Sequence, residues 1–288
     1  MAERRYGGQS EFGQLRRVVV RPPGRAFGDA DPTRWHYAGR PDLARAQAEH
    51  RALVALLEES GVEVLVHDLE LADHADAIYV YDPVLLTDRG AVALRMGKPL
   101  RRGEEAALAA MLERAGVPLL GGLRGDATAE AGDTLWLDPA TLAVGLGFRT
   151  NAAAIEQLRA LLGPAVTVLP VELPYFEGPE ACLHLKSLIS LLDADLAVVH
   201  LDLLPVPFYQ ELCRRRIELI PIEPAEFRTQ ASNVLAVGPR DLLMLDGNPK
   251  SREALERAGC RVRSYRGEEI SLKAEGGPTC LTRPVWRA

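Results

Sequence analysis

The chain has 288 residues, of which 47% are hydrophobic and 26% charged, and its 34 basic and 40 acidic side chains give a net charge of −6. This composition is typical of a folded globular protein and excludes a largely disordered one. An acidic chain without a basic block argues against nucleic acid or an anionic membrane as a partner. Because no apolar run is long enough to span a membrane, we expect a cytoplasmic protein.

The four cysteines and six histidines show no metal-binding pattern. The sequence has no CxxC pair and no HxxxH or HExxH spacing, which are the arrangements that structural and catalytic zinc sites use. Four cysteines in a chain of this length are also too few for a disulfide scaffold. We therefore expect reduced cysteines and no metal site.

One order of elements recurs along the chain. It is clearest in the third copy, where strand patterns at 132–138 and 141–147 precede a helical pattern at 151–163 and a β-branched run at 166–171. The sequence therefore predicts five strand–strand–helix–strand units. In chain order these units span residues 15–69 (weak), 76–120, 132–171, 182–223 (weak) and 232–265.

The repeats predict the fold class. Five such units favour a single α/β domain over residues 1–288, a five-bladed α/β propeller with pseudo-fivefold ββαβ repeats. In such a ring the helices lie outside and one strand of each blade lines a central cavity. An ordinary α/β sandwich with coincidental spacing is the alternative.

Two segments stand out from the repeats. Residues 22–42 form a stretch of some twenty residues rich in proline and glycine, which is either a lid over a site or a surface excursion held by Trp35 and Tyr37. GLGFRT at 145–150 resembles a dinucleotide fingerprint but lacks its third glycine, which argues against nucleotide binding. Arg149 in this segment could still hold an anion.

Candidate catalytic residues lie in several different repeats. Cys280 follows two glycines and a proline in GGPTCLT, His184 begins the fourth unit, and Glu130 precedes the third. Asp76 and Asp82 flank the first strand of the second unit. Each residue alone could be structural, but a ring of repeats brings equivalent strand ends to one cavity. A thiol, an imidazole and carboxylates gathered there suit nucleophilic attack on a cationic carbon.

An ordered set of motifs resembles the guanidino-modifying (pentein) superfamily, and within it the dimethylarginine dimethylaminohydrolases. The motifs are DAIYVYD, GKPLRRGEE, EAGDTLWL, GLGFRTN, LHLKS, ASNVL and GGPTCLT. They cover nearly the whole chain in the family's order, and the resemblance also implies the five-bladed propeller. It implies a small guanidino substrate as partner, no metal or organic cofactor, and a homodimer.

The resemblance also implies roles for individual residues. Cys280 is expected to be the nucleophile, His184 the general acid and base, and Glu130 the carboxylate paired with the histidine and with the substrate guanidinium. Four further residues are expected to bind the substrate. They are Asp82 at the guanidinium, Asp76 at the α-amino group, and Arg95 and Arg149 at the α-carboxylate.

The chain departs from the family pattern at two places. Tyr81 precedes Asp82 where many members carry an acid, and GGPTCLT replaces the commoner LSC or LTC context. Arginine deiminases typically have an acid two residues after the histidine, where this chain has Lys186. The expected function is therefore hydrolysis of an Nω-methylated arginine to citrulline and a methylamine, through a covalent thiouronium on the cysteine. Amidino transfer, deiminase-like hydrolysis of another guanidino compound, and a catalytically silent binding propeller are the alternatives.

Overall fold

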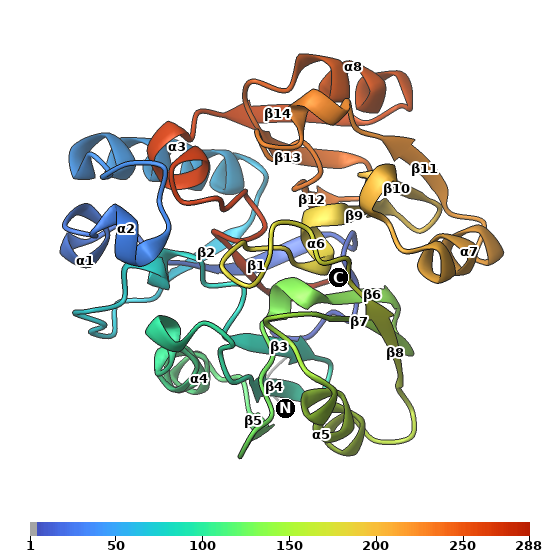
Figure 1. The fold of residues 1–288 in the computed structure, drawn as a ribbon, viewed down its shortest axis with the longest axis horizontal. Helices are drawn as coiled ribbons and strands as arrows, with labels where there is room; N and C mark the ends of the chain where they lie inside the picture. Colours follow the sequence, from blue (N-terminus) through green and yellow to red (C-terminus); the bar gives the residue numbers. More distant parts are fainter. Residues whose placement is uncertain (1–4) are drawn as a thin grey trace.

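The computed structural model describes residues 5–288, which form five three-stranded sheets. Figure 1 shows these sheets set around the middle of the molecule. Four sheets use strands that are consecutive in the chain: β3 (Val84–Thr87), β4 (Gly90–Ala93) and β5 (Leu119–Gly122); β6 (Thr134–Asp138), β7 (Thr141–Leu146) and β8 (Thr167–Glu172); β9 (Ile189–Asp193), β10 (Leu196–Val199) and β11 (Glu218–Pro221); β12 (Leu235–Gly238), β13 (Asp241–Leu245) and β14 (Arg261–Tyr265).

Each of these four sheets pairs its first two strands antiparallel and its last two parallel. A parallel pair needs a crossover, and an α-helix provides it in every case. These helices are α4 (Glu104–Arg114), α5 (Ala152–Leu162), α7 (Val206–Arg214) and α8 (Pro249–Arg257). The mixed α/β class and the predicted order of elements are thus present, although no single sheet closes on itself.

The remaining sheet joins the two ends of the described chain. Strand β1 (Leu15–Val20) lies between β2 (Glu63–Val66), its parallel partner across α3 (Leu43–Glu59), and β15 (Arg283–Arg287), its antiparallel partner. The sequence did not predict β15. This strand supplies the first unit with the element that the repeat pattern lacked there.

Residues 22–42 carry two short helices, α1 (Arg25–Gly28) and α2 (Pro32–Trp35), rather than only a loop. Asp31 caps α2 by accepting a hydrogen bond from the Thr33 N–H. The rings of Phe27 and Tyr37 lie 5.7 Å apart, and both side chains and that of Trp35 are buried. The aromatic anchoring expected for this segment is therefore present, while its movement as a lid stays a prediction.

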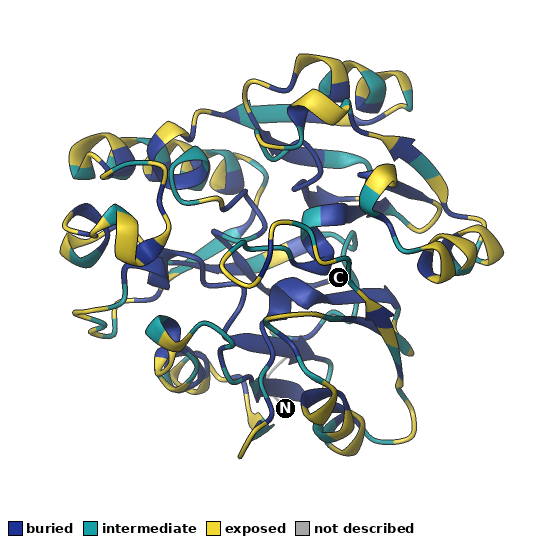
Figure 2. Ribbon diagram, in the orientation of Figure 1, coloured by how far each residue is buried: buried dark blue, intermediate teal, exposed yellow. Residues whose placement is uncertain are grey.

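The remaining helical turns are short. They are α6 (Leu185–Leu188), the 3₁₀ turns η1 (Ala75–Ile78), η2 (Pro99–Arg101), η3 (Ala131–Asp133), η4 (Leu201–Leu203) and η5 (Pro224–Glu226), and the π turn η6 (Glu268–Leu272). Figure 2 shows that buried residues fill the strands, whereas exposed residues follow the outer faces of the helices. Over residues 5–288 no helix is both long and apolar enough to cross a membrane.

Candidate active site

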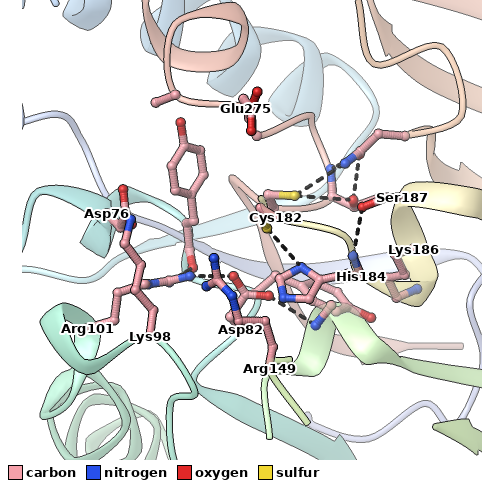
Figure 3. Close-up of a pocket in the computed structure, with 18 of the residues that line it drawn as sticks. Asp76, Asp82, Lys98, Arg101, Arg149, Cys182, His184, Lys186, Ser187 and Glu275 are labelled. Atoms are coloured by element: carbon pink, nitrogen blue, oxygen red, sulfur yellow. Dashed lines mark hydrogen bonds and ion pairs between the residues drawn. The ribbon is translucent and has the colours of Figure 1, made fainter. Parts of the chain in front are cut away.

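One cavity near the middle of the molecule brings together most of the predicted site residues. Cys280, His184, Asp82, Asp76 and Arg149 all line it. Glu130 is completely buried and reaches the cavity through its contact with the histidine. In Figure 3, Asp76, Lys98 and Arg101 lie on one side of this cavity and Cys182, His184 and Lys186 on the other. The lining residues include members of the segment that follows each of the five units, so all five units contribute to the cavity.

His184 is held in a fixed orientation at the start of α6. Its backbone N–H donates to the Ser187 hydroxyl at 3.1 Å, and its Nε2 lies 2.8 Å from a carboxylate oxygen of Glu130. Gly132 packs against the other edge of the imidazole, where a Cβ atom would be 2.4 Å from Nδ1. Burial opposes the charged imidazolium, but the charges of Cys182 and Asp133 raise the pKa of His184 well above its ordinary value. The imidazolium can therefore serve as an acid.

Glu130 stays ionised although it is buried. Burial alone would raise its pKa, but Arg149 and the hydrogen bond to His184 outweigh burial and hold the pKa of Glu130 well below its usual range. Arg149 Nη1 lies 3.3 Å from one carboxylate oxygen, and the Lys98 backbone N–H donates to the other at 2.9 Å. The carboxylate is thus positioned to stabilise positive charge on the imidazole.

Asp82 is fixed by two donors. The Gly132 N–H donates to Oδ1 at 3.0 Å, and Arg101 Nη1 donates to Oδ2 at 2.6 Å. Arg101 also binds Glu104 and the Tyr79 carbonyl, and it is buried. Burial raises the pKa of Glu104 to about 7, against the opposing effect of Arg101.

The two arginines expected at the substrate carboxylate are placed differently. Arg149 lines the cavity, whereas Arg95 is half-buried, pairs its backbone with Ala129 and is not among the lining residues. Arg101, which the sequence analysis did not single out, lines the cavity in its place. The signal for it was present in GKPLRRGEE, a motif that carries two arginines shortly after Arg95.

Cys280 is half-buried, and Asn233 holds its sulfur. The Asn233 Nδ2 donates to Sγ at 3.2 Å, while its Oδ1 accepts from the Thr279 N–H at 3.1 Å and hydroxyl at 2.5 Å. Gly277 makes this approach possible, because a Cβ there would be 2.3 Å from the amide carbon of Asn233. Burial and the nearby Asp82 raise the pKa of the Cys280 thiol, and the Asn233 hydrogen bond and His184 only partly offset them.

The far end of the cavity contains a second buried ion pair. Asp76 accepts hydrogen bonds from the Tyr37 hydroxyl at 2.7 Å and from Lys98 Nζ at 2.6 Å. Lys98 Nζ also donates to the Trp35 carbonyl at 3.1 Å and lies 5.0 Å from the centre of the indole. The segment 22–42 therefore contacts the site directly.

Three further residues line the cavity. Tyr81 and Lys186 are positions at which the chain differs from related families, and Cys182 was not predicted from the sequence. Lys186 donates to Glu11 at 2.6 Å and lies 5.0 Å from the Tyr81 ring centre, so its charge is already paired. Cys182 lies with its sulfur 3.7 Å from His184 Nδ1. Its position two residues before the histidine, in CLHLKS, was the available signal.

Asp82, Glu130 and His184 also have the geometry to hold a cation. One potential ligand atom from each lies within 4.8 Å of the others. Both carboxylates are already bonded to arginines, and the histidine nitrogen is bonded to Glu130. A planar guanidinium, which carboxylates bind through paired hydrogen bonds, matches this set as well as a metal ion does. That the site works without a metal stays a prediction.

Comparison with known families shows which family the chain belongs to. The family described as N,N dimethylarginine dimethylhydrolase, eukaryotic, matches residues 36–287. The chain belongs to this family. It is therefore a member of the pentein superfamily that the motifs indicated, and an enzyme that hydrolyses a carbon–nitrogen bond of an amidine.

Three relatives match most of the chain, and two of them nearly all of it. The dimethylarginine dimethylaminohydrolase of Pseudomonas aeruginosa is 27% identical over 271 residues, which are 93% of this chain and 98% of that protein. An uncharacterised Bacillus subtilis protein is 27% identical over 283 residues, 97% of this chain and 94% of its own length. An arginine deiminase of Listeria welshimeri is 25% identical over 252 residues, 73% of this chain and 61% of its own length.

Solved structures resemble the fold described above. A cysteine-to-serine mutant of the Pseudomonas aeruginosa enzyme complexed with citrulline is 26% identical, has a TM-score of 0.78, and the match covers 94% of this chain and 99% of that one. The N-terminal domain of ArgZ, an arginine dihydrolase from cyanobacteria, gives a TM-score of 0.80 at 22% identity, over 95% of this chain and 98% of that domain. The second likeness concerns the fold alone.

Proposed function

We propose that this enzyme hydrolyses an Nω-methylated arginine to citrulline and a methylamine through a covalent intermediate on Cys280. The observation that carries the proposal is the convergence of Cys280, His184 and Asp82 on one cavity, with Glu130 bonded to the imidazole. In this proposal Asp82 and Glu130 bind the two edges of the guanidinium and turn its carbon toward the sulfur. The positive charge of the bound guanidinium also stabilises the thiolate form of Cys280.

The first half of the reaction forms the intermediate. A bound guanidinium opposes the burial that raises the pKa of Cys280, so the thiol loses its proton to solvent when substrate binds. The thiolate attacks the guanidinium carbon and forms a C–S bond. His184, as an imidazolium, donates its proton to the methylated nitrogen, the C–N bond breaks, and the methylamine leaves. A thiouronium remains on Cys280.

The second half releases the product. The now neutral His184 removes a proton from water, and the hydroxide attacks the thiouronium carbon. The C–S bond breaks, the sulfur leaves as a thiolate, and the hydroxyl of the adduct loses its proton to solvent, which gives the neutral ureido product. His184 is again an imidazolium, and the ion pair with Glu130 stabilises this form in both halves of the cycle.

The proposal also covers the α-amino and α-carboxylate end of the substrate, the closure of the fold, and the location and oligomeric state of the enzyme. The family resemblance assigns Asp76 and Arg149 to the α-amino and α-carboxylate groups of an arginine substrate, and both residues line the cavity. Arg101 lines the cavity as well, whereas Arg95 does not. We further infer that the five sheets are blades of a closed propeller. A cytoplasmic location and a homodimer stay predictions.

The decisive experiment measures citrulline and dimethylamine released from asymmetric dimethylarginine, with arginine and agmatine as competing substrates. The wild type is compared with Cys280→Ser and with Cys213→Ser, a control at an exposed cysteine. We expect turnover of the methylated substrate by the wild type and the control only. Faster turnover of free arginine would refute the substrate, and full activity of Cys280→Ser would refute the covalent mechanism.

Amidino transfer is the second candidate, and one observation favours it. A second cavity adjoins the first and shares six lining residues with it, and an amine acceptor would reach the thiouronium from this side. The shared residues are His36, Glu180, Cys182, Ser187, Gln230 and Glu275. Incubation with substrate plus glycine or lysine, followed by mass analysis, separates transfer from hydrolysis. An amidinated acceptor in place of citrulline would establish transfer.

A further inference from the structure

Lys98 forms an ion pair with Asp76, the acid that the family resemblance assigns to the substrate α-amino group. Both oxygens of Asp76 are bonded, one to the Tyr37 hydroxyl at 2.7 Å and one to Lys98 Nζ at 2.6 Å. The pair is nearly out of solvent, with the Lys98 side chain 13% and the Asp76 side chain 7% exposed. The carboxylate therefore already has an ammonium partner from the protein itself.

Lys98 is held in this place by more than Asp76. Its Nζ donates to the Trp35 carbonyl at 3.1 Å and lies 5.0 Å from the indole centre, where the ring face attracts a cation. Its backbone N–H donates to the Glu130 carboxylate, which fixes the main chain that carries the side chain. Three contacts at Nζ and one at the backbone oppose its withdrawal from the cavity.

A substrate α-ammonium could bind Asp76 only by displacing the Lys98 ammonium, which carries the same charge. The new ion pair would replace the old one, and Lys98 would be left buried, without its carboxylate partner and next to a second cation. Breaking a buried ion pair by removing one partner is strongly unfavourable. An α-ammonium therefore gains nothing at Asp76 and disturbs the pair that is there.

We propose that Lys98 is a specificity-determining residue that takes the place of the α-ammonium, so that the enzyme prefers methylated guanidino acids without an α-amino group. The inference rests on the proposed function and narrows its substrate class. A lysine ammonium has three N–H donors. Within residues 5–288, two of these donors are used, one by Asp76 and one by the Trp35 carbonyl. The third is available to a substrate carboxylate.

The test compares asymmetric dimethylarginine with its des-amino analogue, 5-(N′,N′-dimethylguanidino)pentanoic acid, in the wild type and in Lys98→Met. Methionine keeps most of the length of the side chain and the backbone N–H but removes the charge. We expect the wild type to have at least a tenfold higher kcat/KM for the des-amino acid. In Lys98→Met, where Asp76 is left unpaired, this ratio should shift at least tenfold toward dimethylarginine. A wild-type ratio favouring dimethylarginine, or a ratio that Lys98→Met leaves unchanged, overturns the inference.

Two controls distinguish this inference from a purely structural role of Lys98 and from failure of the proposed function. Lys98→Arg keeps the charge and should keep the preference, whereas a purely structural role would lower kcat/KM for both substrates by the same factor. If neither compound is hydrolysed, the proposed function fails, and calorimetric Kd values for the two compounds then decide the inference by the same tenfold criteria. Should Lys98→Met fail to fold, Lys98→Gln, which keeps a donor for the Trp35 carbonyl, replaces it.

Discussion

Gly132 is the residue through which a single methyl group should disable the enzyme without removing any functional group. It lies in η3, and its φ is outside the left-handed region, so alanine adds no backbone strain. The added Cβ would lie 2.4 Å from His184 Nδ1 and 2.9 Å from Asp82 Oδ1. Ordinary contact begins at 3.4 Å, so the imidazole must move by 3.4 − 2.4 = 1.0 Å.

A displacement of about 1 Å at a reacting group costs about 100-fold in rate. We therefore expect Gly132→Ala to lower kcat by about two orders of magnitude. Overpacking costs about 1–3 kcal/mol of stability, with a fall in Tm of about 2–4 °C for each kcal/mol. The measurements are steady-state release of the ureido product and thermal melting followed by circular dichroism.

The matched control is Gly24→Ala, because a Cβ at Gly24 meets nothing within 4 Å and its φ is −111°. This variant should keep both kcat and Tm. Gly132→Ala with wild-type kcat would refute the reasoning, since it would mean that the histidine need not hold its present position. A loss of kcat together with a collapsed melting transition would instead show that the fold, not the imidazole, had failed.

The remaining predictions concern the nucleophile and the segment over the site. Serine at Cys280 is a weak nucleophile, so turnover should fall by several orders of magnitude while substrate still binds in calorimetry; retained turnover would contradict the mechanism. Because burial raises the pKa of this thiol above its ordinary value, its thiolate fraction is small at neutral pH, and iodoacetamide labelling of the free enzyme should keep accelerating past about pH 8.5, where an exposed cysteine titrates; a plateau near neutrality would be the contrary result. Asn233→Ala removes a hydrogen bond of about 1 kcal/mol to the sulfur, so labelling at neutral pH should slow about fivefold, and an unchanged rate would show that the bond is unimportant. Proteolysis within residues 22–42 should decrease when a substrate analogue binds, and equal cleavage would argue against a lid.

The sequence predicted those parts of the fold that depend on neighbouring residues. The hairpin of β6 and β7 and the helix after it are close in the chain, so turn residues and apolar spacing were sufficient signals. Strand β15 was missed because its partner is β1. No local pattern signals a pairing between such distant segments, and the strand is short, with a proline inside it.

The same limit applies to the site. Ordered motifs indicated Cys280 and His184, which line one cavity as expected. Arg95 and Arg101 are close in the chain, but the proline-initiated turn η2 directs only the second into the cavity. The bond between Lys98 and Asp76 depends on two turns that approach each other in space. Residue types and spacing contain no information on that distance.

We expect the pairing of β1 with β15 to determine when the enzyme becomes active during folding. Closing a loop costs about (3/2)RT ln n, so joining residues about 270 apart costs about 3 kcal/mol more than joining residues about 10 apart. Contacts of such long range form slowly. Cys280 lies three residues before β15, and its carbonyl accepts a hydrogen bond from the Tyr81 N–H in another unit. Local hairpins and helices can therefore be complete in a chain that has no nucleophile in place, and recovery of activity should lag behind recovery of secondary structure.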